Sequence, residues 1–315
     1  MSFIEDIRER ASKSPKNIVL PRSSDERVIK AAEFLQKNNL ANPILIQNEG
    51  AVVPKGLNVI DPVSDEKLKA YASSFFERRK HKGISEADSI EIVKDPLFFA
   101  ASMLAAGDAD GAVAGSVATT GDVLRAAIQT IGLKKGSNVV SSVFIMSFDD
   151  GRVYTYGDCA VVPYPNEEQL ATIAIDSAQT HEKVTGDDPK VAMLSFSTKG
   201  SAEHERIDLV RNALENVRTH NLPFPVDGEL QFDAAIVPDI GKRKAPKSEV
   251  AGQANVFIFP NLDAGNIGYK ITERLAGANA TGPVIQGLAK PMMDLSRGCS
   301  WKDIVNTACV CALMN

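Results

Sequence analysis

Residues 17–47 read NIVLPRSSDERVIKAAEFLQKNNLANPILIQ, with two short apolar runs on either side of a helical pattern. The runs NIVLP (17–21) and NPILIQ (42–47) have the length and the Val and Ile content of buried strands. Between them, DERVIKAAEFLQKNN spaces its apolar residues as an amphipathic helix does. A strand, a helix and a second strand in this order predict a βαβ unit with parallel strands.

The same alternation continues along the chain. Apolar runs separated by helical patterns are typical of mainly parallel sheets covered by helices, so we predict an α/β fold with mainly parallel sheets flanked by helices. A length of 315 residues favours about two domains. The further expected strands are 109–117, 190–197, 232–238 and 254–260, and the further expected helices are 121–131, 201–217 and 264–277.

Composition and charge exclude several classes of protein. With 44% hydrophobic and 24% charged residues, the chain resembles an ordinary soluble globular protein. No run of about 18 apolar residues predicts a membrane span, and the net charge of −5 argues against nucleic-acid binding. The four cysteines and four histidines show no CxxC pair and no metal-ligand spacing, which favours reduced thiols, a cytoplasmic location and no metal site.

The loop GSVATTGDVLR (115–125) follows an expected strand and contains small residues that let the backbone approach a ligand. Thr119 and Thr120 place hydroxyl groups at an expected helix start, where free N–H groups and the helix dipole favour an anion. Arg125 lies about one turn into that helix and can reach back toward the anion. The alternative is that one of the threonines only caps the helix, a routine role of Thr.

Two further loops follow expected strands. SFSTKGSAEHERI (195–207) contains Ser201 and His204, but a Ser–His nucleophile needs an acid that orients the imidazole, so His204 is expected to face solvent. NLDAGNIGYKITERLAG (261–277) is glycine-rich at a helix start. It is either a tight strand-to-helix turn or a phosphate contact.

Near the C-terminus, MMDLSRGCSWKDIV (292–305) joins the pair Ser296 and Arg297 to a later acid, Asp303. Ser300 followed three residues later by Asp303 before an apolar run is the pattern of a capping box, which explains Asp303 without catalysis. The capping box does not explain why Ser296 and Arg297 lie side by side on a loop that ends in a glycine. A hydroxyl and a guanidinium are groups that stabilise developing negative charge.

Six phrases in this chain form an ordered set: RRKHKGIS, ADGAVAGSVATTGDVLR, KVAMLSFSTKGSA, VDGELQFDAA, FPNLDAGNIGYKITERLAG and GPVIQGLAKPMMDLSRG. The set resembles the phosphate acetyltransferase (phosphotransacetylase) family, within the broader phosphate acetyl/butyryltransferase group. Each phrase is moderately specific, and the order of all six is very specific.

The resemblance implies reversible transfer of an acetyl group between acetyl phosphate and coenzyme A (CoA), which interconverts these substrates with acetyl-CoA and phosphate. It implies two α/β domains with the active site in a cleft between them. The first domain is expected to be discontinuous, residues 1–138 plus 288–315, and the second to be residues 139–287. Family members are commonly homodimers and need no tightly bound metal or organic cofactor.

The resemblance also implies catalytic roles for three residues. Ser296 and Arg297 match the family's Ser–Arg pair, and Asp303 matches its catalytic acid. As the base, Asp303 would take a proton from the CoA thiol, but the dipole of a helix favours the ionised carboxylate in its first turn and so opposes this. Burial would have to offset the dipole. Alternatively, Arg297 stabilises the thiolate or the carbonyl oxyanion, to which Ser296 can donate.

Substrate binding is expected from four other residues. Arg125 matches a substrate-binding arginine of the family, and Arg79 of RRKHKG matches another, although Arg78 can be aligned in its place. Both guanidinium groups are expected to hold phosphate, for which their bidentate geometry is suited. Thr119 and Thr120 complete the expected phosphate and CoA set.

We expect the thiolate to attack acetyl phosphate directly in a ternary complex. Cys159 is the one candidate for a covalent nucleophile, and with no histidine nearby in the sequence it is expected to be structural.

Three alternatives stay open. One is a phosphate butyryltransferase, which performs the same chemistry on a longer acyl chain. Another is a catalytically silent acetyl-CoA-binding module of the same fold, as in the C-terminal part of some malic enzymes, against which the retained Ser296, Arg297 and Asp303 argue. The third is an NAD-linked decarboxylating dehydrogenase of similar two-domain shape, which the lack of a clustered aspartate metal site disfavours.

Overall fold

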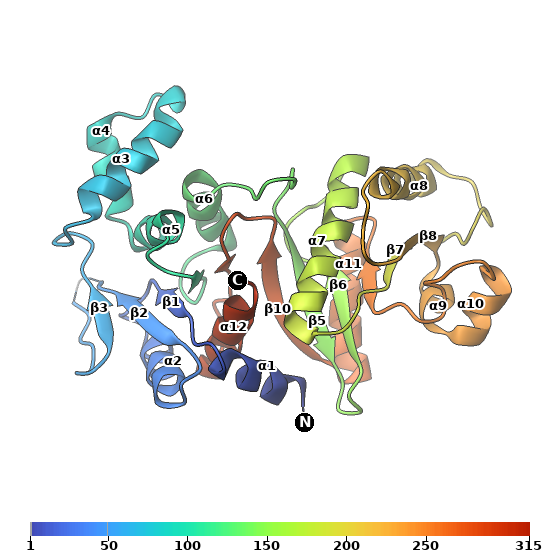
Figure 1. Cartoon of the computed structure of the whole chain (residues 1–315), viewed down its shortest axis with the longest axis horizontal. Coiled ribbons are helices and arrows are strands. Elements are labelled where there is room, and N and C mark those ends of the chain that lie inside the picture. Colours follow the sequence, from blue (N-terminus) through green and yellow to red (C-terminus); the bar gives the residue numbers. More distant parts are fainter. Residues whose placement is uncertain (1, 49) are drawn as a thin grey trace. The chain divides into compact units, whose positions relative to one another are not determined.

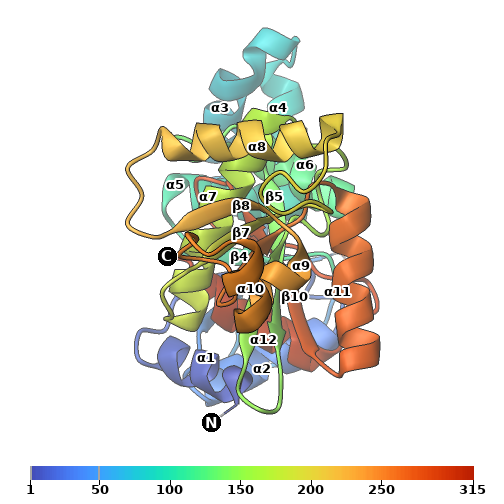
Figure 2. The same ribbon diagram turned by 90° about the vertical axis from the view of Figure 1, so that its right-hand side faces the viewer.

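A computed structural model describes residues 2–48 and 50–315 of the chain. These residues divide into two compact units (Figures 1 and 2). Unit 1 contains residues 3–135 and 288–315, and unit 2 contains residues 136–287. Within the described residues, no helix is both long enough and apolar enough to cross a membrane.

Unit 1 is built on a five-stranded sheet in the order β11-β4-β1-β2-β3, and all of its strand pairs are parallel. The predicted βαβ unit is confirmed, because β1 and β2 pair in parallel with Asn17 opposite Asn42. The strands are β1 (Asn17–Leu20), β2 (Asn42–Ile46), β3 (Asn58–Ile60), β4 (Gly111–Val113) and β11 (Met292–Met293). The helices are α1 (Phe3–Ser12), α2 (Glu26–Lys37), α3 (Leu68–Arg79), α4 (Glu86–Val93), α5 (Pro96–Ala106), α6 (Thr120–Thr130) and α12 (Trp301–Leu313), with a 3-10 turn η1 (Lys80–Lys82) after α3.

The last segment of the chain belongs to the core of unit 1. β11 adds to the sheet beside β4, and α12 packs against α1, α2, β1 and β4. Most of α12 is buried, including Val305, Cys309 and Val310. This apolar helix therefore anchors the loop between β11 and itself, which carries Ser296 and Arg297, to the carboxyl end of the parallel sheet.

Unit 2 contains a six-stranded sheet in the order β10-β5-β6-β9-β7-β8. The strands from β6 to β8 pair in parallel, whereas β10, β5 and β6 form an antiparallel edge. The strands are β5 (Ser141–Ser147), β6 (Val153–Gly157), β7 (Val191–Leu194), β8 (Val226–Leu230), β9 (Val256–Ile258) and β10 (Asn279–Gln286). The helices are α7 (Glu167–Thr185), α8 (Glu205–Arg218), α9 (Phe232–Ile236), α10 (Pro238–Lys244) and α11 (Leu262–Ala276).

Both faces of the unit 2 sheet are covered. Val191 and Met193 of β7 point into a core shared with α7 and α8, whereas Ala192 and Leu194 point into a second core that α9 and Tyr269 of α11 help to form. This alternation of adjacent residues is what a strand buried on both faces requires. The predicted class, an α/β fold with mainly parallel sheets flanked by helices, is confirmed.

One predicted strand is wrong. Residues 232–238 form α9 and the first residue of α10 instead of a strand. Ala234 and Ala235 favour a helix, and Pro238 at the first position of α10 has no N–H to donate to a sheet ladder. The strand of this region is β8, which lies just before, and the expected strands at 109–117, 190–197 and 254–260 contain β4, β7 and β9.

Candidate active site

The predicted catalytic residues lie in the loop between β11 and α12, at the carboxyl edge of the unit 1 sheet. Ligands of open parallel sheets bind beyond this edge. Because β11 lies beside β4, the loop after β11 meets the loop after β4. Their contact is close at Gly115, where φ is +92° and a Cβ atom would overlap both the Asp294 carboxylate and the backbone of Leu295. A glycine is required there.

Ser296 and Arg297 are exposed at the tip of this loop. The Ser296 carbonyl accepts a hydrogen bond from Cys299 N at 2.9 Å, and its hydroxyl oxygen accepts one from Gly298 N at 3.3 Å. These bonds form a tight turn in which the serine O–H remains able to donate. Among the described residues, no acid pairs with the Arg297 guanidinium, so the cation is available to a ligand.

The predicted capping box at the start of α12 is confirmed. Oδ2 of Asp303 accepts hydrogen bonds from Ser300 N at 2.8 Å and Ser300 Oγ at 2.9 Å, and Asp303 N donates to Ser300 Oγ at 3.3 Å. Asp303 is exposed. Its Oδ1 has no hydrogen-bond partner in the described part of the chain. The carboxylate therefore caps the helix with one oxygen and leaves the other open to a substrate.

The two predicted threonines have different partners. Thr119 is the N-cap of α6: its Oγ1 accepts from Asp122 N at 3.2 Å and donates to Asp122 Oδ2 at 2.7 Å. The cap role considered for this position is thus present. Thr120 Oγ1 donates to Oδ2 of Asp294 at 2.6 Å, and so joins α6 to the loop between β11 and α12. The two threonines thus fix the start of α6, one as its cap and one through Asp294.

Arg125 lies on the exposed face of α6, where it donates to Asp122 Oδ1 at 2.8 Å. The hydrogen bond from Thr119, together with the one from Arg125, keeps the pKa of Asp122 below its ordinary value. The arginine side chain is 59% exposed, so this ion pair is weak. An incoming phosphate can exchange with the Asp122 carboxylate at little cost.

Arg79 and Arg78, which the sequence left as alternatives, have distinct environments at the end of α3. Arg78 Nη1 donates at 3.3 Å to the carbonyl of Ile131, the C-cap residue of α6. Arg79 has a buried Nε without a hydrogen-bond partner. Arg78 therefore serves the packing of α3 on α6, and Arg79 keeps donors for a ligand.

Arg27 was missed by the sequence analysis, and it connects the loops of the site. From α2 it donates to the carbonyl groups of Arg297 at 2.9 Å, Cys299 at 2.7 Å and Ser116 at 2.8 Å. Asp25, the N-cap of α2, accepts from its Nε and Nη2 and fixes the plane of the guanidinium. Burial by itself raises the pKa of Asp25, but the bonds from Arg27 outweigh it and the pKa lies below its ordinary value. In the sequence, this pair resembles an ordinary helix start.

Asp294 was also missed. It is 2% exposed, it lies two residues before Ser296, and its Oδ1 has no hydrogen-bond partner in the described residues. Burial raises its pKa above the ordinary value, although the bond from Thr120 opposes this. The Asp294 carboxylate holds Thr120 against the loop between β11 and α12 through one oxygen, and no sequence pattern marks this residue.

A cavity of about 660 Å³ lies in front of α6 and contains Thr119 and Arg125. Asp95, Leu97 and Phe98 near the start of α5 and Arg22 from the loop after β1 also line it. We call this space the α6 cavity. Its size is that of a small-molecule site.

The second predicted loop, at 195–207 in unit 2, is not an open anion site. Its donors already bind the buried carboxylate of Glu229, which accepts from Ser197 Oγ at 2.9 Å, Gly200 N at 2.8 Å and Arg211 Nε at 3.0 Å. Burial alone raises the pKa of Glu229, but these bonds outweigh it and lower the pKa to about 2. His204 is exposed, as predicted, and its Nδ1 accepts from Arg206 N as the N-cap of α8.

The third loop, at 261–277, packs as a tight strand-to-helix turn. Asn261 caps α11 by accepting from Ala264 N at 3.0 Å. A Cβ atom at Gly265 would overlap the Asp158 carbonyl oxygen. The glycine thus lets α11 approach the segment after β6, which is the first of the two alternatives for this stretch.

The chain is similar to known proteins along its whole length. The family model described as phosphate acetyl/butaryl transferase matches residues 2–312. A phosphate acetyltransferase of Thermoanaerobacterium thermosaccharolyticum is 46% identical over 326 aligned residues that cover 99% of each chain. A phosphotransacetylase structure from Streptococcus pyogenes has a TM-score of 0.93 at 39% identity and covers 99% of this chain and 97% of its own. The EutD phosphotransacetylase from Staphylococcus aureus has a TM-score of 0.92 at 41% identity, with the same coverage.

Proposed function

This chain belongs to the phosphate acetyl/butaryl transferase family, and we propose that it is a phosphate acetyltransferase that transfers an acetyl group reversibly between acetyl phosphate and CoA. The observation that carries the proposal is full-length identity of 44–46% to relatives named phosphate acetyltransferase. The resemblance found in the sequence is thereby confirmed. The chain keeps Ser296 and Arg297 on the exposed loop before α12 and Arg125 on α6, which disfavours a catalytically silent module.

In the proposed mechanism, Asp303 takes the proton of the CoA thiol. The geometry supports this role because only Oδ2 is used by the cap of α12, so Oδ1 is free to accept the proton. The thiolate then attacks the carbonyl carbon of acetyl phosphate, a new C–S bond forms, and the bond to the phosphate oxygen breaks. CoA loses its thiol proton, and phosphate leaves.

Arg297 and Ser296 stabilise the charge that develops during this attack. The guanidinium has no acid partner in the described chain, and the serine hydroxyl is free to donate because its oxygen serves as an acceptor for Gly298 N. Donors of this kind stabilise an oxyanion by about 3–4 kcal/mol each in favourable sites. Arg125 and Arg79 hold the phosphate. Thr119 and Thr120 fix the start of α6, the helix that carries Arg125.

The acetyl group passes directly between the substrates. Cys159 is fully buried, its thiol lies 3.5 Å from the Tyr156 carbonyl, and burial raises its pKa well above the ordinary value. A thiol kept protonated in an apolar core is a poor nucleophile. Isotope exchange between acetyl phosphate and phosphate without CoA would show a covalent acetyl-enzyme and would refute direct transfer.

We also propose domains, assembly and location. The two compact units support domain boundaries at 1–138 plus 288–315 and at 139–287. A homodimer is supported by α11, where Ile267, Ile271 and Leu275 recur every fourth residue and are 58%, 52% and 84% exposed. A cytoplasmic location is supported by four free, buried cysteines. We propose further that CoA acts as a substrate and that the reaction needs no tightly bound cofactor.

The function is tested with acetyl phosphate and CoA in an assay of thioester absorbance. Wild-type protein is expected to form acetyl-CoA and to use butyryl phosphate poorly. Absence of thioester with folded protein would refute the proposal, and faster turnover of butyryl phosphate would identify a butyryltransferase instead.

The role of Asp303 is separated from its cap by a matched pair of variants. Asp303→Asn removes the base and weakens the cap, whereas Ser300→Ala weakens the same cap and keeps the carboxylate. Both are expected to lose about 0.5–2 kcal/mol of stability. Only Asp303→Asn is expected to lower kcat, by at least about 10²-fold. Equal kcat values in the two variants would refute the role of Asp303 as the base and leave it only the role of a helix cap.

A further inference from the structure

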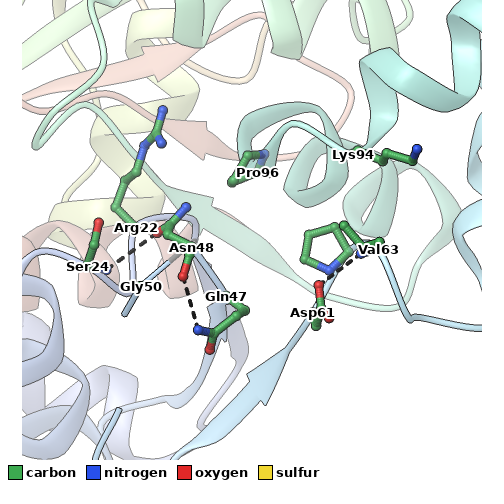
Figure 3. A pocket seen from close by; sticks show the side chains of 10 residues that line it. Arg22, Ser24, Gln47, Asn48, Gly50, Asp61, Val63, Lys94 and Pro96 are labelled. Atoms are coloured by element: carbon green, nitrogen blue, oxygen red, sulfur yellow. Dashed lines mark hydrogen bonds between the residues drawn. The ribbon is translucent and has the colours of Figure 1, made fainter. Parts of the chain in front are cut away.

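Arg22 Nε and Asp294 Oδ1 are buried polar atoms that lack a hydrogen-bond partner in the described part of the chain. The two groups differ in their access to a ligand. Arg22 lines the α6 cavity and a second cavity of about 690 Å³, which Asn48, Asp61 and Lys94 also line (Figure 3). Asp294 is 2% exposed and lines neither of these cavities. The role of this acid therefore lies inside the protein.

Asp294 is a buried charge without a cation. Among the residues that the structure describes, no lysine or arginine pairs with it, and the only hydrogen bond from another side chain comes from Thr120 Oγ1 at 2.6 Å. Burial of an unpaired carboxylate costs free energy, and apolar side chains would hold the same two segments together without that cost. The acid therefore indicates a task that needs the direction of a hydrogen bond.

The bond between Asp294 and Thr120 joins two parts of the candidate active site. Thr120 is the first residue of α6, the helix that carries Arg125. Asp294 comes directly after β11 and two residues before Ser296, and β11 is itself fixed in the sheet beside β4. The bond thus sets the distance between the helix that carries Arg125 and the turn that carries Ser296.

The turn formed by Ser296 and Arg297 is held on both of its sides. On its carboxyl side, Arg27 donates to the carbonyl groups of Arg297 at 2.9 Å and Cys299 at 2.7 Å. On its amino side, Asp294 is bonded to the start of α6. Loss of the Asp294 bond would leave the turn attached to α2 through Arg27 but no longer attached to α6 by a side-chain hydrogen bond.

We propose that Asp294 is a positioning residue for acetyl transfer, which holds α6 at a fixed distance from the Ser296–Arg297 turn through Thr120. This inference rests on the proposed function. In acetyl phosphate the phosphoryl and carbonyl groups belong to one small molecule, so the groups that hold the first and the donors that meet the second must be correctly spaced. An error of about 1 Å in such a spacing costs on the order of 10²-fold in rate. Because Asp294 is buried, it acts on the rate without touching the substrate.

The first experiment removes the hydroxyl group that donates to Asp294. Thr120→Val keeps the shape of the side chain without its donor, and Thr120 is exposed, so no core is disturbed. Thr130→Val is the matched control in α6, because Thr130 Oγ1 has no hydrogen-bond partner in the described residues. In the thioester assay, we expect Thr120→Val to lower kcat by about 10–10²-fold and Thr130→Val to keep the wild-type value. Thr120→Ser, which restores the O–H, should recover most of the loss.

The second experiment separates positioning from folding. Asp294→Asn keeps an oxygen that can accept from Thr120 but removes the buried charge, and a hydrogen bond to a neutral acceptor is weaker than one to a carboxylate. We expect kcat to fall by about tenfold. The melting temperature should stay at or above that of wild type, because no unpaired charge is then buried. A purely structural role predicts the opposite result, a lower melting temperature with unchanged kcat.

Two further measurements connect the effect to this one bond. KM for acetyl phosphate should change by less than about threefold in either variant, because Arg125 and Arg79 keep their guanidinium groups. In the double variant with Asp294→Asn and Thr120→Val, kcat should equal that of Thr120→Val alone, since both substitutions act on the same bond. A loss equal to the product of the two single losses would show that the residues act independently and would overturn the proposal.

The same assays distinguish failure of this inference from failure of the proposed function. Wild-type and Thr130→Val proteins that form no acetyl-CoA would refute the function, and with it a positioning role in that reaction. Active wild-type protein together with a folded Thr120→Val protein of wild-type kcat would overturn only the role of Asp294. An Asp294→Asn protein that melts lower and keeps its kcat would do the same.

Discussion

Arg27 donates hydrogen bonds to both loops of the candidate site, and we call this set of bonds the Arg27 clamp. Its removal tests whether these bonds hold the two loops in position. Arg27→Gln removes three hydrogen bonds to the carbonyl groups of Ser116, Arg297 and Cys299 and leaves the Asp25 carboxylate without its partner. Hydrogen bonds from a charged donor are worth about 1.5–3 kcal/mol each, which sets an upper limit of roughly 5–9 kcal/mol for the three. The Arg27 side chain is 34% exposed, so water replaces part of this. We expect a loss of about 2–4 kcal/mol.

The loss should depend on pH. Because the pKa of Asp25 is lowered in the folded protein, its ionised form stabilises the fold at pH values above its ordinary pKa, and this contribution disappears as the pH falls through the lowered value. Arg27→Gln removes that contribution. The difference in unfolding free energy between wild type and variant should therefore shrink as the solution is acidified below about pH 4.

In the folded Arg27→Gln protein, kcat should also fall, because the Arg27 clamp positions the Ser296–Arg297 turn. A shift of about 1 Å in a catalytic loop costs on the order of 10²-fold in rate. We expect kcat to fall by about this factor in the thioester assay, with KM for acetyl phosphate nearly unchanged because Arg125 and Arg79 keep their positions. Arg27→Lys, which can reach fewer carbonyl groups, should be intermediate.

The control is Lys13→Gln, which removes an exposed pair with Glu9 of α1 at 2.9 Å and should change neither stability nor kcat measurably. A cooperatively folded Arg27→Gln protein with wild-type kcat would refute the reasoning. In that case the loops after β4 and β11 would hold their geometry without the clamp.

Further predictions concern single positions. Gly115→Ala should destabilise unit 1 by at least about 2 kcal/mol and lower kcat, because the Cβ atom overlaps the Asp294 loop at a φ of +92°; a normal melting curve would contradict this. Glu229→Gln should lose roughly 3 kcal/mol at neutral pH, since its pKa of about 2 lies below the ordinary 4.5, and denaturant melts should show the loss vanishing as the pH falls from about 4.5 to about 2. Ile271→Glu should convert the proposed dimer to a monomer in light scattering, and an unchanged mass would exclude α11 from the interface.

Local patterns in the sequence determined much of this protein. The βαβ unit at 17–47 follows from the period of its apolar residues, and the capping box of Ser300 and Asp303 follows from two side chains three positions apart. Local propensity also explains the one wrong strand, since residues 232–238 are apolar but contain alanines and a proline that favour helices. The antiparallel edge of unit 2 was not foreseen, because strand direction depends on partners distant in the chain.

The contacts that shape the site were decided only by the tertiary structure. Arg27 bonds to residues 89, 270 and 272 positions away, and Thr120 bonds to Asp294 across 174 positions. No local pattern encodes such pairs, because they arise when β11 takes its place beside β4 and brings two loops to one edge of the sheet. The same holds for Arg22, whose unsatisfied Nε is visible only once the surrounding loops bury it. The sequence determined which groups are present, and packing at the carboxyl edge of the sheet decided which of them meet.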